Sequence, residues 1–475
     1  MRILLGIAPF VFDNTYPGDM NRPLRKKGFT LIQGPTPCLG MLYIASVLRR
    51  DSHHDVSYFE GAFHGVPELL ATIERWRPDV VGFMVTVPFW KNTQRTIRAV
   101  RDRFPEVRIL VGGRHVDLVR EEIMRDCAEI DFAGVGDCEY TVKELLDTLE
   151  KGGDPASVPG LLIRSGGEIM ATAPREPIQD LDEIPFPAFD LVEFNRYAPS
   201  IGQYNRLPNI TMIGSRGCPH RCLFCTSEDD LRERSVENII AEIDWLVRDF
   251  GLKDILFYDE DLTEKHDRLE HLCDTLIARD YDLTWSGNAR SDNIAGMDEK
   301  LLRKMRRAGC WKLLFGLESG VQRDLDTLRK EFTVEESVVA VEKASRAGIS
   351  LFCTFIFGIP DQTYDDCLKT IDFACGLKGI EFAKFLTFTP FPGSEVYNDI
   401  DRYGKIVAPP SKMTVNNITF VPHTLTVEQI TELYRIGMKS FYKRPSYILH
   451  RLVTMRSIDH LKQNIRGFRA FLLSR

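Results

Sequence analysis

Three cysteines stand within eight residues of a short stretch that also holds glycine and proline, SRGCPHRCLFC. Cys218, Cys222 and Cys225 follow the spacing C-x3-C-x2-C, and no fourth cysteine stands close to them in the sequence. Cysteine thiolates are soft ligands that bind zinc and the iron of iron–sulfur clusters. So compact a group in a loop predicts a metal centre rather than three thiols that merely pack in a core.

Two kinds of metal centre fit this stretch. A structural zinc site closes with four ligands, so His220, inside the stretch, would have to be the fourth. A four-iron cluster takes cysteine thiolates as its usual ligands, and three of them would leave one iron open. An open iron can bind and activate a substrate, whereas a fully ligated cluster mainly carries electrons. The missing fourth cysteine therefore favours an iron–sulfur cluster that takes part in chemistry.

The composition is that of a soluble globular protein. The chain has 475 residues, which predicts two or three domains, and 44% of them are apolar and 27% charged. The net charge of −7 argues against general nucleic-acid binding. An odd number of cysteines, 11, without a secretion signal predicts the reducing cytoplasm rather than a disulfide framework. Since no stretch of about 18 apolar residues occurs, we expect no membrane span.

Apolar strand-like runs alternate with amphipathic helical segments over residues 1–150. Such alternation predicts a parallel sheet covered on both faces, a doubly wound Rossmann-like domain that binds ligands at the carboxyl ends of its strands. Residues 151–205 are rich in proline, glycine and aspartate, which predicts a linker with a small hairpin turning at Gly166-Gly167.

The alternation resumes over residues 206–400, where six consecutive strand–helix units predict a partial (β/α)6 barrel of the TIM type. The active site of such a barrel lies at the carboxyl ends of its strands, and the cysteine stretch comes directly after the first of them. Residues 401–475 are expected to be mostly helical. This region is basic at its end, with eight Lys/Arg and one acidic residue from Phe441 onward.

A C-x3-C-x2-C loop after the first strand of a barrel resembles the radical S-adenosylmethionine (SAM) superfamily. The resemblance implies that the three cysteines ligate a 4Fe-4S cluster and that its open iron chelates the amino and carboxylate groups of SAM. Electron transfer then cleaves SAM to methionine and a 5′-deoxyadenosyl radical. A small electron donor such as flavodoxin or ferredoxin is the expected partner.

Further motifs at expected strand ends resemble the SAM-binding positions of that superfamily. The stretch FYDEDLT carries Asp259 and Glu260, where the family holds the SAM amino group, and Arg290 in GNARSDNI corresponds to a contact with the SAM carboxylate or ribose. Glu318 in FGLESG needs a partner if it is buried, and SAM or Arg290 could be it. Finally, FIFGIPDQT resembles the turn that faces the adenine of SAM. In this sequence Gly358 and Pro360 belong to that turn.

The N-terminal half resembles the cobalamin-binding-domain subfamily through DVVGFMVTVP, ILVGGRHV, DFAGVGDCE and the linker IPFPAFDL. The resemblance implies backbone contacts to cobalamin from these residues: Val85, Thr86, Gly112, Gly113 and Gly134 to Gly136. Glycine has a physical reason there, because a bulky planar ligand needs close backbone approach. The Asp-x-His-x-x-Gly stretch that supplies an axial histidine elsewhere is absent, so we expect no protein imidazole on cobalt. His115 is the only imidazole near these positions, and a helix-capping or surface role suits it at least as well as one at cobalt.

Together these motifs predict an enzyme that modifies a small natural-product or lipid substrate by methyl transfer to an unactivated carbon, or by radical rearrangement or cyclisation. Two alternatives stay open: a cobalamin-free radical SAM dehydratase or dehydrogenase acting on a sugar or aminoglycoside, and a non-enzymatic iron–sulfur or zinc scaffold. The sequence names no catalytic acid or base. The basic C-terminal segment could also contact an anionic membrane surface, which would suit a lipid substrate.

Overall fold

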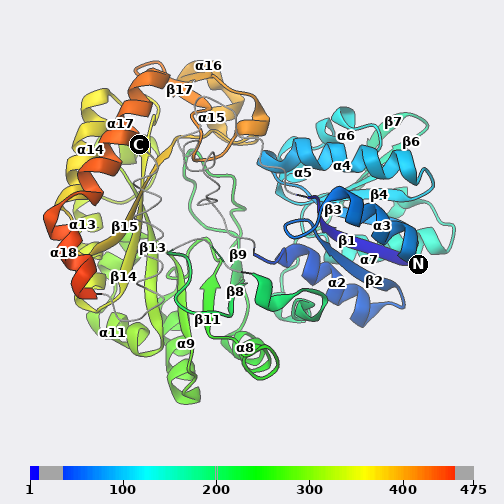
Figure 1. Cartoon of the computed structure of the whole chain (residues 1–475), viewed down its shortest axis with the longest axis horizontal. Coiled ribbons are helices and arrows are strands. Elements are labelled where there is room, and N and C mark those ends of the chain that lie inside the picture. Colours follow the sequence, from blue (N-terminus) through cyan, green and yellow to red (C-terminus); the bar gives the residue numbers. More distant parts are fainter. Residues whose placement is uncertain (10–35, 198, 200–201, 455–475) are drawn as a thin grey trace. The chain divides into compact units, whose positions relative to one another are not determined.

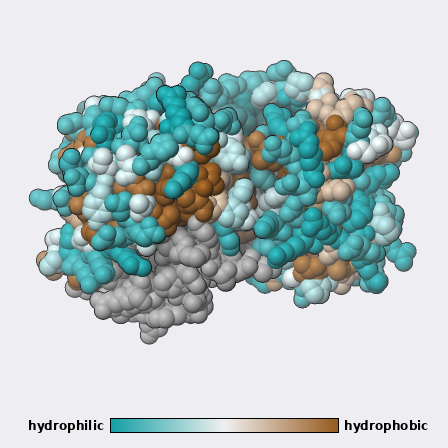
Figure 2. Space-filling view, turned by 90° about the horizontal axis from the view of Figure 1, so that it is seen from above, coloured by the Kyte–Doolittle hydropathy of each residue, from teal (hydrophilic) through white to brown (hydrophobic). Residues whose placement is uncertain are grey.

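The computed structural model describes residues 1–9, 36–197, 199 and 202–454. The main division of the chain into two compact units falls between Arg196 and Tyr197. In the face shown in Figure 2, hydrophilic residues cover most of the surface, with smaller apolar patches between them. None of the helices in the described residues is long and apolar enough to cross a membrane.

The first unit is built on a seven-stranded sheet in the order β2-β1-β3-β4-β5-β6-β7, whose first five strands are parallel. These strands are β1 (Arg2–Ile7), β2 (Asp55–Glu60), β3 (Val80–Met84), β4 (Arg108–Gly112) and β5 (Phe132–Gly134). The helices are α2 (Leu39–Asp51), α3 (Val66–Trp76), α4 (Trp90–Arg103), α5 (Arg114–Val119), α6 (Glu122–Asp126) and α7 (Glu139–Glu150). This is the expected doubly wound, Rossmann-like arrangement.

Two apolar cores lie on the two faces of this sheet. One contains Leu4 of β1 with residues of α3 and α4, and the other contains Ile3 and Leu5 with residues of α2 and α7. Successive side chains of a strand point to opposite faces, so a strand buried on both faces must be apolar throughout. That requirement explains the continuous apolar run at the start of the chain.

The hairpin expected within the linker belongs instead to the sheet of the first unit. Strands β6 (Leu161–Ser165) and β7 (Glu168–Ala171) are joined through Gly166 and Gly167, both at positive φ, and β6 pairs antiparallel with β5. Leu162 enters one core, and Leu161 and Ile163 enter the other. The hairpin therefore extends the sheet because its apolar residues bury on both faces.

The second unit contains a six-stranded parallel sheet in the order β15-β14-β13-β12-β11-β8. Its strands are β8 (Asn209–Met212), β11 (Asp254–Phe257), β12 (Thr284–Ala289), β13 (Cys310–Glu318), β14 (Ser350–Phe357) and β15 (Ile380–Thr387). The sheet stays open between β15 and β8. The expected partial (β/α)6 barrel is therefore confirmed.

The helices that follow these strands lie along one side of the sheet in Figure 1. They are α8 (Val236–Phe250), α9 (His266–Arg279), α10 (Ser291–Gly296), α11 (Glu299–Arg307), α12 (Gln322–Thr327), α13 (Val334–Arg346) and α14 (Tyr364–Gly376). Three helices, α13, α14 and α17 (Val427–Tyr442), begin with capping boxes, in which Thr333, Thr363 and Thr426 each accept a hydrogen bond from the backbone N–H three residues on.

The remaining short elements connect or follow the barrel. They are the pair β9 (Ser215–Arg216) and β10 (Arg232–Glu233), the pair β16 (Gly404–Ile406) and β17 (Phe420–Pro422), and the helices α15 (Glu395–Asn398), α16 (Ile400–Tyr403) and α18 (Pro445–Thr454). The region after residue 400 thus combines helices with one small antiparallel pair. Most of its basic segment, residues 455–475, lies outside the described residues.

Candidate cluster and cofactor sites

The cysteine loop follows β8 and is fastened to the rest of the second unit at several points. The Cys218 N–H donates to the Glu228 carbonyl at 2.8 Å, and the Leu223 N–H donates to the Leu328 carbonyl at 3.0 Å. The Phe224 ring packs edge-on against Phe388, with centroids 6.2 Å apart. The three thiols are free and lie at or near the surface. The loop therefore has a fixed path that presents all three.

The surroundings of the thiols fit a cluster better than a zinc ion. Among the described residues, two groups place three candidate ligand atoms within 4.8 Å of one another, and neither includes a cysteine. His220, the possible fourth zinc ligand, belongs to one of them and has its Nε2 3.1 Å from Glu264 Oε2. A single zinc ion needs its ligand atoms close together, whereas in a cluster each thiolate binds a different iron.

Burial, together with the negative charges of Glu260 and Asp261, raises the pKa of the Cys218 thiol to about 11. Burial and Glu260 also raise the pKa of Cys225. Thiols in such surroundings are protonated at neutral pH unless a cation offsets the negative charge. Soft donors beside carboxylates thus suit a bound metal cluster.

The acidic residues at the end of β11 separate into two roles. Asp259 is buried, and its carboxylate accepts from the Gly214 N–H at 2.9 Å and the Ser215 hydroxyl at 2.6 Å. This carboxylate therefore fixes the entrance of the cysteine loop and has no oxygen left without a partner. Glu260 is exposed, and its charge acts on two of the cysteines. Of the two, Glu260 is better placed to meet the SAM amino group.

Glu318, at the end of β13, is buried and paired with a lysine that the sequence did not indicate. Lys330 Nζ lies 3.1 Å from Glu318 Oε1, and the Thr354 hydroxyl donates to Oε2 at 3.3 Å. The expected alternative partner, Arg290, bonds to Asp292 instead. The prediction that Arg290 could be the partner of Glu318 is therefore wrong. No periodic pattern marks Lys330, which follows α12 in a loop, so only the tertiary fold reveals it.

Arg290 nevertheless belongs to the same cluster of charges. Its guanidinium donates to Asp292 at 2.9 Å and to the Lys330 carbonyl at 2.6 Å. Burial lowers the pKa of Lys330, but the negative charges of Glu318 and Cys222 outweigh it, so this pKa is raised overall. Arg290, at the end of β12, and Lys330, which follows α12, thus both lie close enough to Cys222 to interact with its charge.

The backbone at Glu318 adopts an uncommon conformation. Its φ is +59°, in the left-handed region, and the β13–β14 register shifts between Gly316 and Glu318. A β-bulge re-aims side chains, and strained backbone of this kind gathers at functional sites. Here it turns the carboxylate toward Lys330 and Thr354.

The turn after β14 is also tightly held. Gly358 has a φ of +84° and donates its N–H to Gln362 Oε1 at 2.9 Å, while the Gln362 amide donates to Asp324 at 2.7 Å. Pro360 is buried. Gly358 and Pro360 therefore lie in a rigid turn at the same carboxyl edge of the sheet as the cysteine loop.

In the first unit, the residues expected to meet cobalamin lie at the carboxyl ends of β3, β4 and β5. Val85 is buried, and the hydroxyl of Thr86 is a buried polar atom without a hydrogen-bond partner in the described structure. Gly113 and Gly136 have φ of +99° and +75°. A Cβ added at Gly136 would meet no atom within 4 Å. An orphaned hydroxyl and open space beside a glycine backbone fit a flat ligand there.

Gly112 and Gly134 differ in how much room they leave. A Cβ added at Gly112 would meet its nearest atoms at 3.9–4.0 Å, whereas one at Gly134 would lie 2.7 Å from Cys138 Sγ. Gly134 is therefore required by close packing inside the unit. Gly112 leaves ordinary contact distance at the strand end.

His115 is buried, which contradicts the expected helix-capping or surface role. Its ring packs against Trp90 with centroids 5.6 Å apart, and its Nδ1 has no hydrogen-bond partner in the described structure. Burial lowers the pKa of His115 to about 4, and Asp126 only partly offsets this. The imidazole is therefore neutral near pH 7. Cobalt bound without a protein imidazole stays a prediction.

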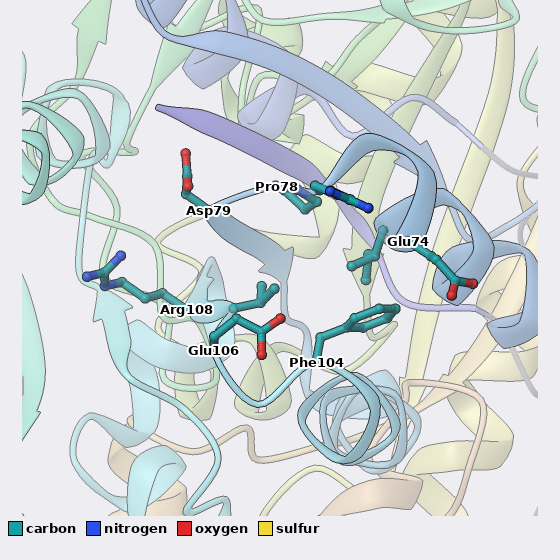
Figure 3. A pocket seen from close by; sticks show the side chains of 9 residues that line it. Glu74, Pro78, Asp79, Phe104, Glu106 and Arg108 are labelled. Atoms are coloured by element: carbon teal, nitrogen blue, oxygen red, sulfur yellow. The ribbon is translucent and has the colours of Figure 1, made fainter.

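A separate groove in the first unit lies at the opposite edge of the sheet (Figure 3). It is lined by Asp79, which directly precedes β3, by Arg108, which begins β4, and by Glu74 and Glu106. Asp79 and Arg108 thus lie at the amino ends of β3 and β4. The glycine-rich loops expected to meet cobalamin lie at the carboxyl ends of the sheet's strands. The groove is therefore remote from the expected cofactor edge.

Comparisons with known proteins identify the family. A profile of the Radical SAM superfamily matches residues 212–374, and one of the B12 binding domain matches residues 27–146. An uncharacterized methyltransferase of Pyrococcus horikoshii is 30% identical over 439 residues, covering 91% of this chain and 93% of the relative. The chain belongs to the radical SAM superfamily. It is a radical SAM enzyme with a 4Fe-4S cluster, SAM and a cobalamin-binding domain.

A further curated protein and a solved structure are also similar to this chain. The anaerobic magnesium-protoporphyrin IX monomethyl ester cyclase of Rubrivivax gelatinosus is 26% identical over 388 residues, which are 80% of this chain and 69% of the cyclase. The solved structure of the cobalamin-dependent SAM radical enzyme OxsB, with aqua-cobalamin and SAM bound, has a TM-score of 0.71 at 17% identity. The match covers 100% of this chain and 71% of that enzyme, which shows a shared fold.

Proposed function

We propose that this radical SAM enzyme transfers a methyl group from SAM, with cobalamin as carrier, to a carbon atom of a small natural product or lipid. The observation that carries the proposal is the gathering of functional side chains at one edge of the barrel. Three thiols, Glu260 and Arg290 lie there on the loops that follow β8, β11 and β12, and Glu318 ends β13 and pairs with Lys330. The methyltransferase relative, which covers nearly the whole chain, favours methyl transfer.

Each of these side chains has a proposed role. Cys218, Cys222 and Cys225 hold the cluster, which when bound supplies the electron that cleaves SAM. The exposed Glu260 carboxylate accepts a hydrogen bond from the SAM ammonium group. The Arg290 guanidinium donates a hydrogen bond to the SAM carboxylate or ribose. Lys330 holds Glu318 so that its carboxylate faces SAM, and the turn with Gly358 and Pro360 packs against the adenine.

In the N-terminal unit, Val85, Thr86, Gly112, Gly113 and Gly136 would contact cobalamin. Glycine at these strand ends lets the backbone approach a planar ligand closely. The free hydroxyl of Thr86 could donate a hydrogen bond to it. Asp259 is proposed as a positioning residue for the cysteine loop rather than a SAM contact.

The products released from SAM test the proposal. Anaerobically reconstituted enzyme should release S-adenosylhomocysteine and 5′-deoxyadenosine, and release of the first should require added cobalamin. Release of 5′-deoxyadenosine alone, with or without cobalamin, would favour ring closure or the cobalamin-free dehydratase or dehydrogenase over methyl transfer. Release of neither product from protein that holds iron would point to a scaffold.

Ring closure is a second candidate reaction, because an anaerobic cyclase is among the relatives. A cyclase would form 5′-deoxyadenosine without methyl loss from SAM. The same product analysis therefore separates the two reactions.

Other features of the proposal concern partners and location. A small redox protein such as flavodoxin or ferredoxin would deliver the electron. Three further points stay predictions. They are location in the cytoplasm, the absence of nucleic-acid binding, and contact of the basic C-terminus with a membrane.

A further inference from the structure

The two last strands of the barrel show different burial on their two faces. On the face toward the helices, Cys353, Phe355 and Phe385 are fully buried. On the opposite face, which we call the inner face, Phe352 and Thr354 of β14 and Phe382, Lys384 and Leu386 of β15 are only half-buried. A row of partly accessible side chains inside a barrel is available to a ligand, whereas the helix-facing row is core.

Lys384 is the charged member of this row, and no described residue compensates its charge. It makes no hydrogen bond or ion pair with any residue of the described structure, and burial lowers its pKa. Partly removing an ammonium group from water without a compensating anion costs free energy. By contrast, the buried Lys330 is compensated by Glu318. An uncompensated inward lysine is therefore a candidate for binding an anion from outside the chain.

The position of Lys384 connects it to the proposed SAM site. In the sheet it pairs directly with Thr354, which in turn pairs with Gly316 of β13. The Thr354 hydroxyl donates to Glu318. One row of neighbouring side chains thus runs from Glu318 through Thr354 to Lys384, since neighbouring strands of a sheet lie about 4.7–4.9 Å apart.

Below Lys384 the inner face is aromatic. The rings of Phe352 and Phe382, which pair across β14 and β15, have centroids 6.0 Å apart and are tilted by 31°. Leu386 follows on the other side of Lys384 along β15. A cation between apolar side chains suits a ligand that carries one anionic group on an apolar body.

We propose that Lys384 binds a carboxylate or phosphate group of the substrate, while Phe352 and Phe382 contact the apolar body of that substrate. The inference rests on the proposed function, because it names the substrate class of the same site. It adds Lys384 as a specificity-determining residue.

Titration calorimetry on the full-length, anaerobically reconstituted enzyme tests this with three probes. They are 2-naphthoate, 2-naphthyl phosphate and the neutral 2-naphthylmethanol, so the first two distinguish a carboxylate from a phosphate. We expect at least one anion to bind about tenfold or more tightly than the neutral probe, as a charge-assisted contact predicts. The preference should vanish in Lys384→Met, persist in Lys384→Arg and persist in Lys405→Met, where an exposed lysine of β16 is changed.

Equal affinity for anionic and neutral probes in the wild-type enzyme, binding of none of them, or a preference that survives in Lys384→Met would overturn the inference. Iron content and circular dichroism of Lys384→Met show whether it folds, and Lys384→Arg supports the assignment independently. Release of 5′-deoxyadenosine and S-adenosylhomocysteine is measured on the same preparations. Absence of anion preference in the wild-type enzyme with intact SAM products rejects only this inference. Absence of SAM products with intact anion preference in the wild-type enzyme rejects only the proposed function.

Discussion

Side chains that look equivalent in the sequence differ in what they contact. Asp259 and Glu260 are neighbours in one acidic stretch. The Asp259 carboxylate accepts hydrogen bonds from Gly214 and Ser215, whereas Glu260 is exposed. The cysteine spacing could be interpreted from the sequence alone, because three ligands within one loop need no tertiary information. Lys330 could not be found this way, since its role depends on Glu318, 12 residues earlier, being turned toward it by a bulge.

At the cluster, Cys222→Ala should abolish iron incorporation, because each remaining thiolate can hold only its own iron. Iron and sulfide content after anaerobic reconstitution measures this. Cys375→Ala is the matched control, since this half-buried thiol lies in α14 away from the loop. Full iron content in Cys222→Ala would exclude a three-cysteine cluster.

Removing Lys330 should weaken SAM binding. In Lys330→Met the buried Glu318 loses its charge partner, so we expect a loss of roughly 1.5–3 kcal/mol, or about tenfold to over a hundredfold in SAM affinity. The neighbouring Arg329→Met, which breaks only an exposed pair with Glu395, should keep wild-type affinity. Equilibrium dialysis with labelled SAM distinguishes the two. Unchanged affinity in Lys330→Met would mean that Glu318 does not face SAM.

The buried His115 should make stability depend on pH. Its folded pKa of about 4 lies below the ordinary histidine value of about 6.5, so between these values the unfolded chain binds the extra proton and stability falls as pH falls. The slope from this group is about 1.4 kcal/mol per pH unit. The Tm of the wild-type protein should therefore drop more steeply between pH 6.5 and 4 than that of His115→Gln. Parallel curves would show that the imidazole gains access to water.

At the scale of elements, the alternation of strand-like and helical segments is sufficient to predict both sheets, because parallel strands buried on both faces leave long apolar runs. The hairpin β6–β7 was harder. Its sequence shows two short strands and a Gly-Gly turn, but nothing local indicates that Leu162 and Ile163 enter opposite cores. Pairing with a distant strand edge is a tertiary property, so the hairpin was wrongly assigned to a linker.

The path of the cysteine loop depends on Gly217. Its φ is +85°, and an added Cβ would lie 2.0 Å from the Asp230 carbonyl oxygen. Gly217→Ala should therefore distort the loop, lower stability by more than about 1 kcal/mol and reduce iron incorporation. Gly296→Ala, a helical glycine with open space around its Cβ, should retain both. Tm and iron content are the measurements, and normal iron in Gly217→Ala would show that the loop can take another path.

At the scale of the whole chain, two units with separate cores are assigned different cofactors. Each fold could be predicted from its own sequence pattern, since each buries its apolar residues internally. The substrate could not be predicted from the sequence, because its proposed contacts come from side chains such as Lys384. Whether such a side chain can bind a ligand depends on which residues surround it in the fold. Separate cores also imply that a local change in the first unit should leave the iron site of the second intact.

Gly136→Val tests this separation. The open space beside Gly136 would be filled by the new side chain at a strained φ of +75°, so we expect cobalamin affinity to fall by about tenfold or more while iron content and SAM binding stay at wild-type levels. Gly152→Val is a matched control, because Gly152 has a φ of +65° and equally open surroundings but follows α7, away from the strand ends. It should carry the same backbone strain and still bind cobalamin normally. Cobalamin uptake followed by ultraviolet–visible spectroscopy gives the result, and equal loss in both variants would mean that strain, not contact with the ligand, explains the effect.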